Sequence, residues 1–296
     1  MDAALTSKGH VLVTGARGYV GRAVVSELAA DGYEPRELLG DIRSGASLAD
    51  AVRGVVGVVH LAGVARVRDA GVTELESVNA GGTATLLSVL SAAGSRVPVV
   101  LASSAAVYGS SGGRLSEASA VAPVNAYGRS KLLAEHHLAA YEGPTVALRC
   151  FNVAGALPGM PDADGTRIVN RALAVARGSL DSLTINGDGT ARRDYVHVAD
   201  VAAAYRLALE SSLSGLHAEK RCYVVGSGVG VSLTEIVAAV EATTGRPVPV
   251  TYGPAGDEAA ELVADPALAA HDLDWEPHRS QLGRIIHDAW TATSAT

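Results

Sequence analysis

The sequence predicts an α/β fold in which helices cover both faces of a mostly parallel, doubly wound β-sheet. Three observations favour this class. Short runs rich in β-branched residues alternate with amphipathic stretches through the first half of the chain. The first of these runs, 10–14, ends in a glycine-rich turn that opens a helix. The length of 296 residues, 48% of them hydrophobic, also leaves room for a second, smaller domain around a core of its own.

The first half of the chain supplies the strands and helices of this sheet. Strands are predicted where apolar runs end in polar or glycine-rich turns, at 10–14, 55–61, 98–103 and 145–151. Helices are predicted between these strands at 21–30, 73–93 and 126–141. Strands that alternate with helices in this way are typical of a parallel sheet.

The character of the chain changes after Gly155. Residues 156–166 are rich in Pro, Gly and Asp and predict a loop. Beyond it, the patterns predict helices at 167–177, 200–209 and 234–244, strands at 182–185 and 245–249, and a turn at 186–189. We therefore expect one domain from 1–155 with a returning segment of about 189–212, and a second from 156–188 and 213–296.

Composition excludes several classes of function. The net charge is −7 and no cluster of Lys and Arg stands out, so nucleic acid and anionic membranes are not expected partners. No stretch reaches the ~18 apolar residues of a membrane span. Cys150 and Cys222 form no CxxC pair, and the adjacent His136 and His137 lack the spacing of metal ligands. We therefore expect no metal site, and cysteines that stay as free thiols in the reducing cytoplasm. The amino-terminal residues are not expected to form a signal peptide.

The glycines after the first strand predict a dinucleotide cradle. Gly15, Gly18 and Gly21 follow the strand with the spacing G-x-x-G-x-x-G. The first allows a tight turn, the second lets a pyrophosphate approach the backbone, and the third lets the helix pack close to the sheet. The helix amino terminus then offers free N–H groups and a positive dipole end to phosphates. The segment indicates a Rossmann-type domain that binds a dinucleotide.

The segment after this helix departs from the usual pattern. An acidic residue is expected about 20 residues on, for the ribose hydroxyls, but position 39 is Leu39 and the next acid is Asp41. Residues 33–54 are also too few for a full strand–helix–strand–helix segment, since one βαβ unit takes about 30 residues. We infer that one strand–helix unit is trimmed. Because the nearby arginines Arg17, Arg36 and Arg43 offer charge to a 2′-phosphate, NADP is not excluded.

A second motif predicts hydride-transfer chemistry. Tyr127 and Lys131 are four residues apart on a predicted helix, so they share a face. A lysine ammonium beside a phenol favours the phenolate and is expected to lower its pKa, which makes Tyr127 a usable acid or base. Ser104, at the end of a predicted strand, offers a hydroxyl to the same substrate oxygen. These three residues are the predicted catalytic set.

With these residues the chain resembles the extended short-chain dehydrogenases/reductases of the NAD-dependent epimerase/dehydratase family, and most of all the UDP-galactose 4-epimerases. The resemblance covers roughly residues 10–290. It is carried by the strings Gly15–Gly21, Gly40-Asp41-Ile42-Arg43, His60-Leu61-Ala62-Gly63, Ser103–Gly109, Tyr127–Lys131, Leu148–Asn152 and Arg193–Val198. It identifies the first domain as NAD-binding and the second as substrate-binding.

The resemblance implies roles for individual residues. Tyr127 is the catalytic base and acid, Lys131 its modulator and a ribose ligand, and Ser104 the hydroxyl partner. The residues implied to bind the cofactor are Gly15, Gly18, Tyr19, Val20, Gly21, Asp41, Ile42, Leu61, Ala62, Gly63, Asn79, Ser103, Tyr127, Lys131 and Phe151. Those implied to bind the substrate are Ser104, Tyr127, Asn152 and Arg193. The trimmed unit corresponds to strand two and its helix.

The chain also departs from the family at the substrate. Pro254 stands where relatives usually have an arginine two residues before a Gly-Asp pair, and Asn186 where many have a base-stacking aromatic residue. Sugar 4,6-dehydratases carry an Asp-Glu pair after the catalytic hydroxyl residue, because elimination needs an extra acid and base. Ala105 and Ala106 stand there, so no dehydratase activity is expected.

The leading hypothesis is an NAD-dependent epimerase that inverts C4 of a nucleotide sugar through a transient keto intermediate, and that forms a homodimer through its long helices. The alternative is an NAD(P)H-dependent ketoreductase on an NDP-sugar or a related hydroxylated molecule, which uses the same residues but consumes cofactor. A third class is a non-catalytic binding protein that keeps the fold. The full set of Ser104, Tyr127 and Lys131 argues against it.

Overall fold

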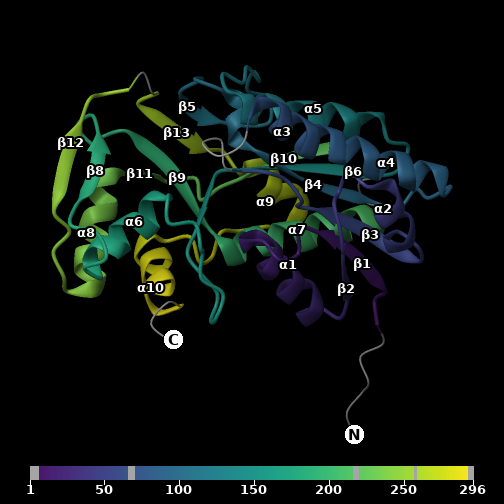
Figure 1. Cartoon of the computed structure of the whole chain (residues 1–296), viewed down its shortest axis with the longest axis horizontal. Helices are drawn as coiled ribbons and strands as arrows, with labels where there is room; N and C mark the ends of the chain where they lie inside the picture. Colours follow the sequence, from purple (N-terminus) through teal and green to yellow (C-terminus); the bar gives the residue numbers. More distant parts are fainter. Residues whose placement is uncertain (1–6, 66–70, 216–219, 257–258, 293–296) are drawn as a thin grey trace, which may run out of the picture.

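The computed structural model describes residues 7–65, 71–215, 220–256 and 259–292, and its centre is a six-stranded sheet (Figure 1). The strands follow the order β10-β6-β4-β3-β1-β2. Their bounds are β1 (His10–Thr14), β2 (Glu34–Glu37), β3 (Val55–His60), β4 (Val99–Ser104), β6 (Thr145–Cys150) and β10 (Arg221–Val225). Every neighbouring pair is parallel, which confirms the predicted class.

Helices cover both faces of this sheet (Figure 1). On one face lie α1 (Tyr19–Ala30) and α7 (Val198–Leu213), and on the other lie α2 (Gly45–Ala51), α4 (Gly82–Ala92) and α5 (Ala126–Ala140). The side chains of β1 show how the sequence supports both layers. Val11 and Val13 are buried with α1 and α7, whereas Leu12 is buried with α4 and α5. Because successive strand residues face opposite sides, a strand covered on both faces needs a continuous apolar run.

The sheet ends at β2, and the position of this strand corrects the expectation that strand two and its helix form the trimmed unit. Residues 33–54 hold a single strand and a single short helix, as the shortened interval predicts. However, β2 lies directly beside β1, with Glu37 opposite Val13, so the strand next to β1 is not the missing one. Among the described residues, the sheet lacks a strand outside β2. The retained neighbour pairs the backbone groups of β1, which would be costly to leave unpaired.

A smaller α/β part follows the carboxyl ends of the main sheet. In it, β11, β9, β13 and β5 form one sheet with β7 paired to β9, and β12 pairs with β8. Helices α6, α8 and α10 pack on these strands around a separate apolar core (Figure 1). The bounds are β5 (Gly113–Leu115), β7 (Asn152–Ala154), β8 (Leu183–Asn186), β9 (Arg192–His197), β11 (Gly230–Ser232), β12 (Val250–Gly253), β13 (Glu261–Ala264), α6 (Ile168–Ala176), α8 (Leu233–Thr244) and α10 (Leu282–Ala292).

The remaining elements join these parts. They are α3 (Val72–Leu75), a π-helical turn (Glu76–Gly81), a 3₁₀ turn (Ala105–Tyr108) and α9 (Ala267–Leu273). The predicted helix 73–93 is therefore a continuous run of α3, the π-helical turn and α4. In the described part of the chain, no helix has the length and apolar character needed to span a membrane.

Two boundaries from the sequence differ from the structure. The predicted strand at 245–249 is wrong, because Gly245 ends α8 in the left-handed conformation and β12 begins only at Val250. The expected returning segment, 189–212, also differs from the sheet pairing. β9 lies within it but pairs in the smaller sheet, whereas β10 lies beyond it but pairs with β6 in the main sheet.

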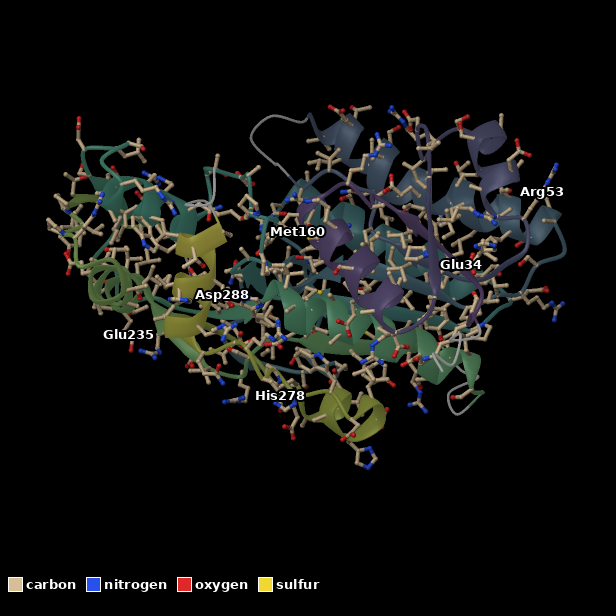
Figure 2. All side chains as sticks on the ribbon, turned by 90° about the horizontal axis from the view of Figure 1, so that it is seen from below. Glu34, Arg53, Met160, Glu235, His278 and Asp288 are labelled. Carbon is tan, nitrogen blue, oxygen red and sulfur yellow. The ribbon has the colours of Figure 1, made fainter. Side chains whose placement is uncertain are left out.

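The loop between β7 and α6 lies between the two parts. Figure 2 shows Met160 of this loop between Glu235 at one end of the molecule and Glu34 toward the other. The Tyr19 hydroxyl, at the start of α1, donates to the Gly155 carbonyl oxygen at 2.6 Å. The loop is therefore tied to the helix that follows the glycine-rich turn.

Candidate active site

The turn after β1 has the shape that a bound pyrophosphate requires. Gly15 has a φ of +71°, and a Cβ there would lie 2.7 Å from the Ala62 backbone nitrogen. A Cβ at Gly21 would collide with the Gly15 carbonyl oxygen, so α1 packs this closely only because the residue is glycine. Gly18 is the N-cap of α1, and no side chain caps the helix. The first N–H groups of α1 therefore remain available to an anion, such as the pyrophosphate of a dinucleotide.

A cavity of about 380 Å³ opens beside this turn. Its walls come from the ends of β3, β4 and β6, the first turns of α5, and the chain from β7 to α6. The predicted site residues on its walls are Val20, Leu61, Gly63, Ser103, Ser104, Tyr127, Lys131, Phe151 and Asn152. Because the carboxyl ends of parallel strands meet at one edge, residues distant in sequence converge there.

Ser104 and Tyr127 meet on the cavity wall. Both side chains line the cavity, and Ser104 is placed to act on the ionisation of the Tyr127 phenol. The Ser104 hydroxyl oxygen accepts from the Ala106 backbone N–H at 3.2 Å, which orients the side chain at the end of β4. Asn125 caps α5 by accepting from the Gly128 N–H at 2.8 Å, so the helix begins directly before Tyr127. A strand end and a helix start thus bring the two hydroxyls together.

Lys131 lies one turn further along α5 and is only 6% exposed. Its ammonium donates to the Ala102 carbonyl oxygen at 2.9 Å and lies 5.8 Å from the centroid of the Tyr127 ring. Gly63 makes room for it, since a Cβ there would lie 3.3 Å from Nζ. The predicted pairing of Tyr127 and Lys131 on one helix face is thereby confirmed.

Burial opposes ionisation of both groups. It raises the pKa of the Tyr127 phenol, and the Ser104 side chain and the positive charge of Arg167 counter this only in part. Burial also lowers the pKa of Lys131 to about 8. The expectation that Lys131 holds the pKa of Tyr127 below its ordinary value is therefore wrong for the protein alone, because desolvation is the larger effect. A further positive charge beside the phenol, such as an oxidised nicotinamide, favours the phenolate.

Asn79 supports the site from the π-helical turn and is 2% exposed. Its Oδ1 accepts from the Val64 N–H at 2.7 Å, and its Nδ2 donates to the Ser130 hydroxyl at 2.9 Å. The side chain therefore links the segment after β3 to α5. A π-helical turn inserts an extra residue and is frequent at functional sites.

Several residues implied to bind the cofactor have other partners. The Ser103 hydroxyl donates to Glu135. Ile42 is 5% exposed and packs in the apolar core under α4. Both carboxylate oxygens of Asp41 hold Arg43, at 2.9 and 2.5 Å, which lowers the pKa of Asp41 to about 2. Their roles toward the cofactor remain predictions.

The residues at the substrate end of the site differ more from what the resemblance implies. Arg193 is not on the cavity wall, and its Nη1 donates to the carbonyl oxygens of Arg192 and Ala259, both at 2.9 Å. Pro254 follows the exposed end of β12, and Asn186 ends β8 beside it. Asp257, the acid of the Gly-Asp pair, lies outside the described residues.

The cavity wall includes charged residues that the sequence patterns did not indicate. Arg167 precedes α6, and its Nη1 lies 3.2 Å from Asp162 Oδ2 while its Nε lies 3.6 Å from Asp164 Oδ2. The guanidinium lies 5.1 Å from the centroid of the Tyr19 ring. Among the described lining residues, Lys131 and Arg167 are the two cations. An arginine at the end of an Asp-rich loop reads as a surface charge, so only the fold reveals its position.

A second overlooked residue is Glu37, the last residue of β2. Its Oε2 lies 3.0 Å from Nε of Arg17, which stands inside the glycine-rich turn. The spacing rule pointed to Leu39, which is 72% exposed, whereas the acidic residue that ends β2 lies two residues earlier. The acidic residue was visible in the sequence. To recognise its place, however, the bounds of β2 had to be known, and no apolar run marks this strand.

The chain is similar to known proteins over almost its whole length. Residues 11–226 match the model of the NAD dependent epimerase/dehydratase family. A UDP-glucose 4-epimerase of Lacticaseibacillus casei is 35% identical, with 95% of both chains covered. A UDP-glucose 4-epimerase of Streptomyces lividans is 34% identical, also with 95% of both chains covered.

Solved structures agree with these relatives. The UDP-glucose 4-epimerase from Brucella ovis in complex with NAD superposes with a TM-score of 0.89 at 34% identity, covering 95% of this chain and 97% of that one. The UDP-glucose 4-epimerase from Stenotrophomonas maltophila, with bound NAD and formylated UDP-arabinopyranose, gives a TM-score of 0.90 at 29% identity, covering 97% and 98%.

Proposed function

This chain belongs to the NAD-dependent epimerase/dehydratase family, and we propose that it is an NAD-dependent epimerase that inverts C4 of a nucleotide sugar. The observation that carries this is the meeting of Ser104, Tyr127 and Lys131 on one cavity wall, next to a glycine turn shaped for a dinucleotide. The curated relatives with this architecture are UDP-glucose 4-epimerases.

The residues of the turn and the cavity fit NAD. The uncapped start of α1 would hold the pyrophosphate, and Leu61, Gly63 and Phe151 on the cavity wall would back the nicotinamide end. Lys131, the buried cation beside Tyr127, is placed to donate to the ribose of that end. When bound, NAD⁺ accepts the C4 hydrogen with its two electrons and later returns it.

Tyr127 moves the proton. Its phenol, ionised when a positive charge lies beside it, removes the proton of the sugar 4-hydroxyl as the C4 hydrogen departs. The Ser104 hydroxyl donates to the same oxygen and stabilises the charge that develops there. After the 4-keto sugar has turned its opposite face, Tyr127 returns the proton to the oxygen. The net reaction inverts C4 and consumes no cofactor.

The nucleotide end of the substrate requires a cation, because it carries a diphosphate. We assign this role to Arg167, which, like Asn152, lies on the cavity wall. The resemblance assigns it to Asn152 and Arg193, and both stay in the proposal. Pro254 offers no charge at the place of the usual arginine, which leaves Arg167 as the guanidinium that the described cavity wall presents.

A test follows the C4 hydrogen. Purified protein receives UDP-galactose with deuterium at C4 and no added cofactor, and NMR follows the product. We expect UDP-glucose that retains its deuterium at C4, because the hydrogen leaves and returns within one site. Transfer of the label to the oxidised cofactor, with one 4-keto sugar and one reduced cofactor formed per substrate oxidised, would instead identify a ketoreductase working in the oxidative direction. Loss of water to give a 4-keto-6-deoxy sugar would contradict the expectation of no dehydratase activity. That expectation rests on Ala105 and Ala106, which supply no acid–base pair.

We further propose a cytoplasmic homodimer. The support is a set of large apolar side chains exposed on and near α3 and α5: Val72 (53%), Val124 (62%) and Leu133 (41%). Side chains of this kind become buried when the same helices of a second copy pack on them. Light scattering at several protein concentrations should give twice the 30.0 kDa chain mass, whereas a monomer at all concentrations would contradict it.

A further inference from the structure

We propose that Arg22 of α1 is a positioning residue for the nucleotide end of the substrate. Through a hydrogen bond to the loop between β7 and α6, it holds the guanidinium of Arg167 in place on the cavity wall. Arg22 directly follows the glycine motif, which gives it no role of its own. The inference rests on the proposed function in one respect, namely that Arg167 binds the diphosphate of a nucleotide sugar.

Arg22 lies on α1, one residue after Gly21, and its side chain reaches the loop. Its Nη2 donates to the Pro161 carbonyl oxygen at 2.7 Å, across 139 residues of sequence. Its Nε is buried without a hydrogen-bond partner among the described residues. Because an unpaired buried donor costs free energy, the bond from Nη2 to the loop is the contact that compensates for placing this guanidinium here.

The turn that Arg22 holds, 157–161, has few other anchors. Met160, labelled in Figure 2, donates its backbone N–H to the Leu157 carbonyl oxygen at 2.9 Å, and this bond closes the turn on itself. Among the described residues, Arg22 supplies the hydrogen bond that reaches this turn from another element. The position of the turn therefore depends on α1, the helix that begins at the glycine turn.

Asp162 carries the position of the turn to Arg167. It follows Pro161 directly, and its side chain is only 6% exposed. Its Oδ2 lies 3.2 Å from Nη1 of Arg167 and accepts from Nδ2 of Asn170 at 2.9 Å. The guanidinium of Arg167 also lies 5.1 Å from the centroid of the Tyr19 ring, which belongs to α1. A shift of the turn would therefore move the carboxylate against which Arg167 is set.

One edge of the Arg167 guanidinium stays open. Its Nη1 lies against Asp162 and donates to the Val153 carbonyl oxygen at 3.2 Å, and its Nε lies 3.6 Å from Asp164 Oδ2. Among the described residues, Nη2 has no hydrogen-bond partner, so its N–H groups are left for an anion. Charge-assisted hydrogen bonds depend on distance and angle. Holding Arg167 therefore contributes to binding of the diphosphate and not to the chemistry at C4.

The test is a double-mutant cycle between Arg22→Met and Arg167→Gln. Calorimetric titration with UDP gives the affinity for the nucleotide end, steady-state kinetics with UDP-galactose separate KM from kcat, and fluorescence titration gives the Kd of NADH. Arg22→Lys keeps a cationic donor for the Pro161 carbonyl oxygen and tests rescue. Arg246→Met is the matched control, because the Arg246 Nη1 donates to the Ala176 carbonyl oxygen at 3.2 Å, at the other end of α6.

We expect Arg22→Met to raise the Kd of UDP and the KM by about fivefold, because the loop loses a charge-assisted hydrogen bond. The values of kcat and of the NADH Kd should stay within about twofold, because Arg22 is not on the cavity wall. In the Arg167→Gln background the same change should have no further effect, since its route to the nucleotide is gone. Arg22→Lys should restore most of the affinity, and Arg246→Met should match wild type. Should Arg22→Met not fold, Arg22→Gln takes its place in the cycle.

A Kd of UDP that changes by less than about twofold in Arg22→Met would overturn the inference. So would effects of the two single variants that add in the double variant, because Arg22 would then act without Arg167. An equal rise in the Kd of NADH would also overturn it, since Arg22 would then act on the glycine turn. If Arg167→Gln weakens UDP binding while Arg22→Met does not, only this inference fails. If wild type binds no UDP, or Arg167→Gln leaves its Kd unchanged, the proposed role of Arg167 fails with it.

Discussion

Glu135 on α5 and Arg149 on β6 form a double ion pair beneath the catalytic helix. Arg149 Nε lies 3.0 Å from Glu135 Oε1, and Nη2 lies 2.7 Å from Oε2. The side chains are 11% and 10% exposed. Glu135 follows Tyr127 and Lys131 at four-residue intervals on one helix face, and it also accepts the Ser103 hydroxyl. The pair therefore holds the helix that carries the catalytic groups against the strands.

Replacing Arg149 by Met should destabilise the protein strongly. The change leaves the Glu135 carboxylate buried without its cation, which typically costs about 3 kcal/mol or more of the free energy of unfolding. Urea unfolding measures it. The control is Arg96→Met, which removes an ion pair with Glu142 whose side chains are 71% and 73% exposed, and should cost less than ~1 kcal/mol. Equal costs for both variants would contradict a positioning role for the buried pair.

Tyr127→Phe should abolish most turnover while the protein still binds NADH. The variant removes the proton-transfer oxygen and leaves the ring, so kcat should fall by about 10²- to 10⁴-fold. The Kd of NADH from fluorescence titration should stay within about threefold, because the other contacts remain. Tyr252→Phe, at a side chain that is 62% exposed, is the control and should change neither value. Unchanged kcat in Tyr127→Phe would exclude the mechanism.

Lys131→Met should make the cofactor-free protein more stable at neutral pH, and inactive. Burial lowers the pKa of Lys131 from 10.5 to about 8. Between these values the unfolded chain binds more protons than the folded protein, so the free energy of unfolding of wild type rises with pH. Below about pH 8 the folded protein bears the full cost of the buried charge, which methionine removes. The variant's advantage in urea unfolding should therefore be largest near pH 7 and shrink toward pH 10. A variant less stable than wild type at pH 7, or an advantage independent of pH, would contradict the assignment.

Arg167→Gln should weaken substrate binding more than cofactor binding. The variant removes the guanidinium that we propose to bind the diphosphate, so KM for UDP-galactose should rise by about tenfold or more. The Kd of NADH should change by less than about threefold. Arg129→Gln, on the exposed side of α5, removes a cation away from the cavity and is the control. Equal effects on KM and on the NADH Kd would mean that Arg167 acts on the glycine turn through Tyr19 rather than on the substrate.

Much of the fold and of the chemistry was predictable, because it depends on neighbours along the chain. The face shared by Tyr127 and Lys131 follows from the helical repeat, and the place of Gly15 and Gly21 from the geometry of a strand–turn–helix unit. The apolar run 10–14 was equally informative, since both faces of its strand are buried. The strand β2 was missed because its residues, Glu-Pro-Arg-Glu, form an edge and carry no apolar pattern.

The sequence by itself determined the class of fold, and it predicted the residues that we propose as the cofactor cradle and the catalytic set. Only the tertiary structure decided how charges are distributed around them. Arg167 reaches the cavity through a loop tied to α1, and Glu37 meets Arg17 because β2 pairs beside β1. Likewise, the pKa of Lys131 follows from burial by several segments. Local patterns act over three or four residues, whereas the charge state and contacts of a side chain depend on whatever the fold brings within a few ångströms of it.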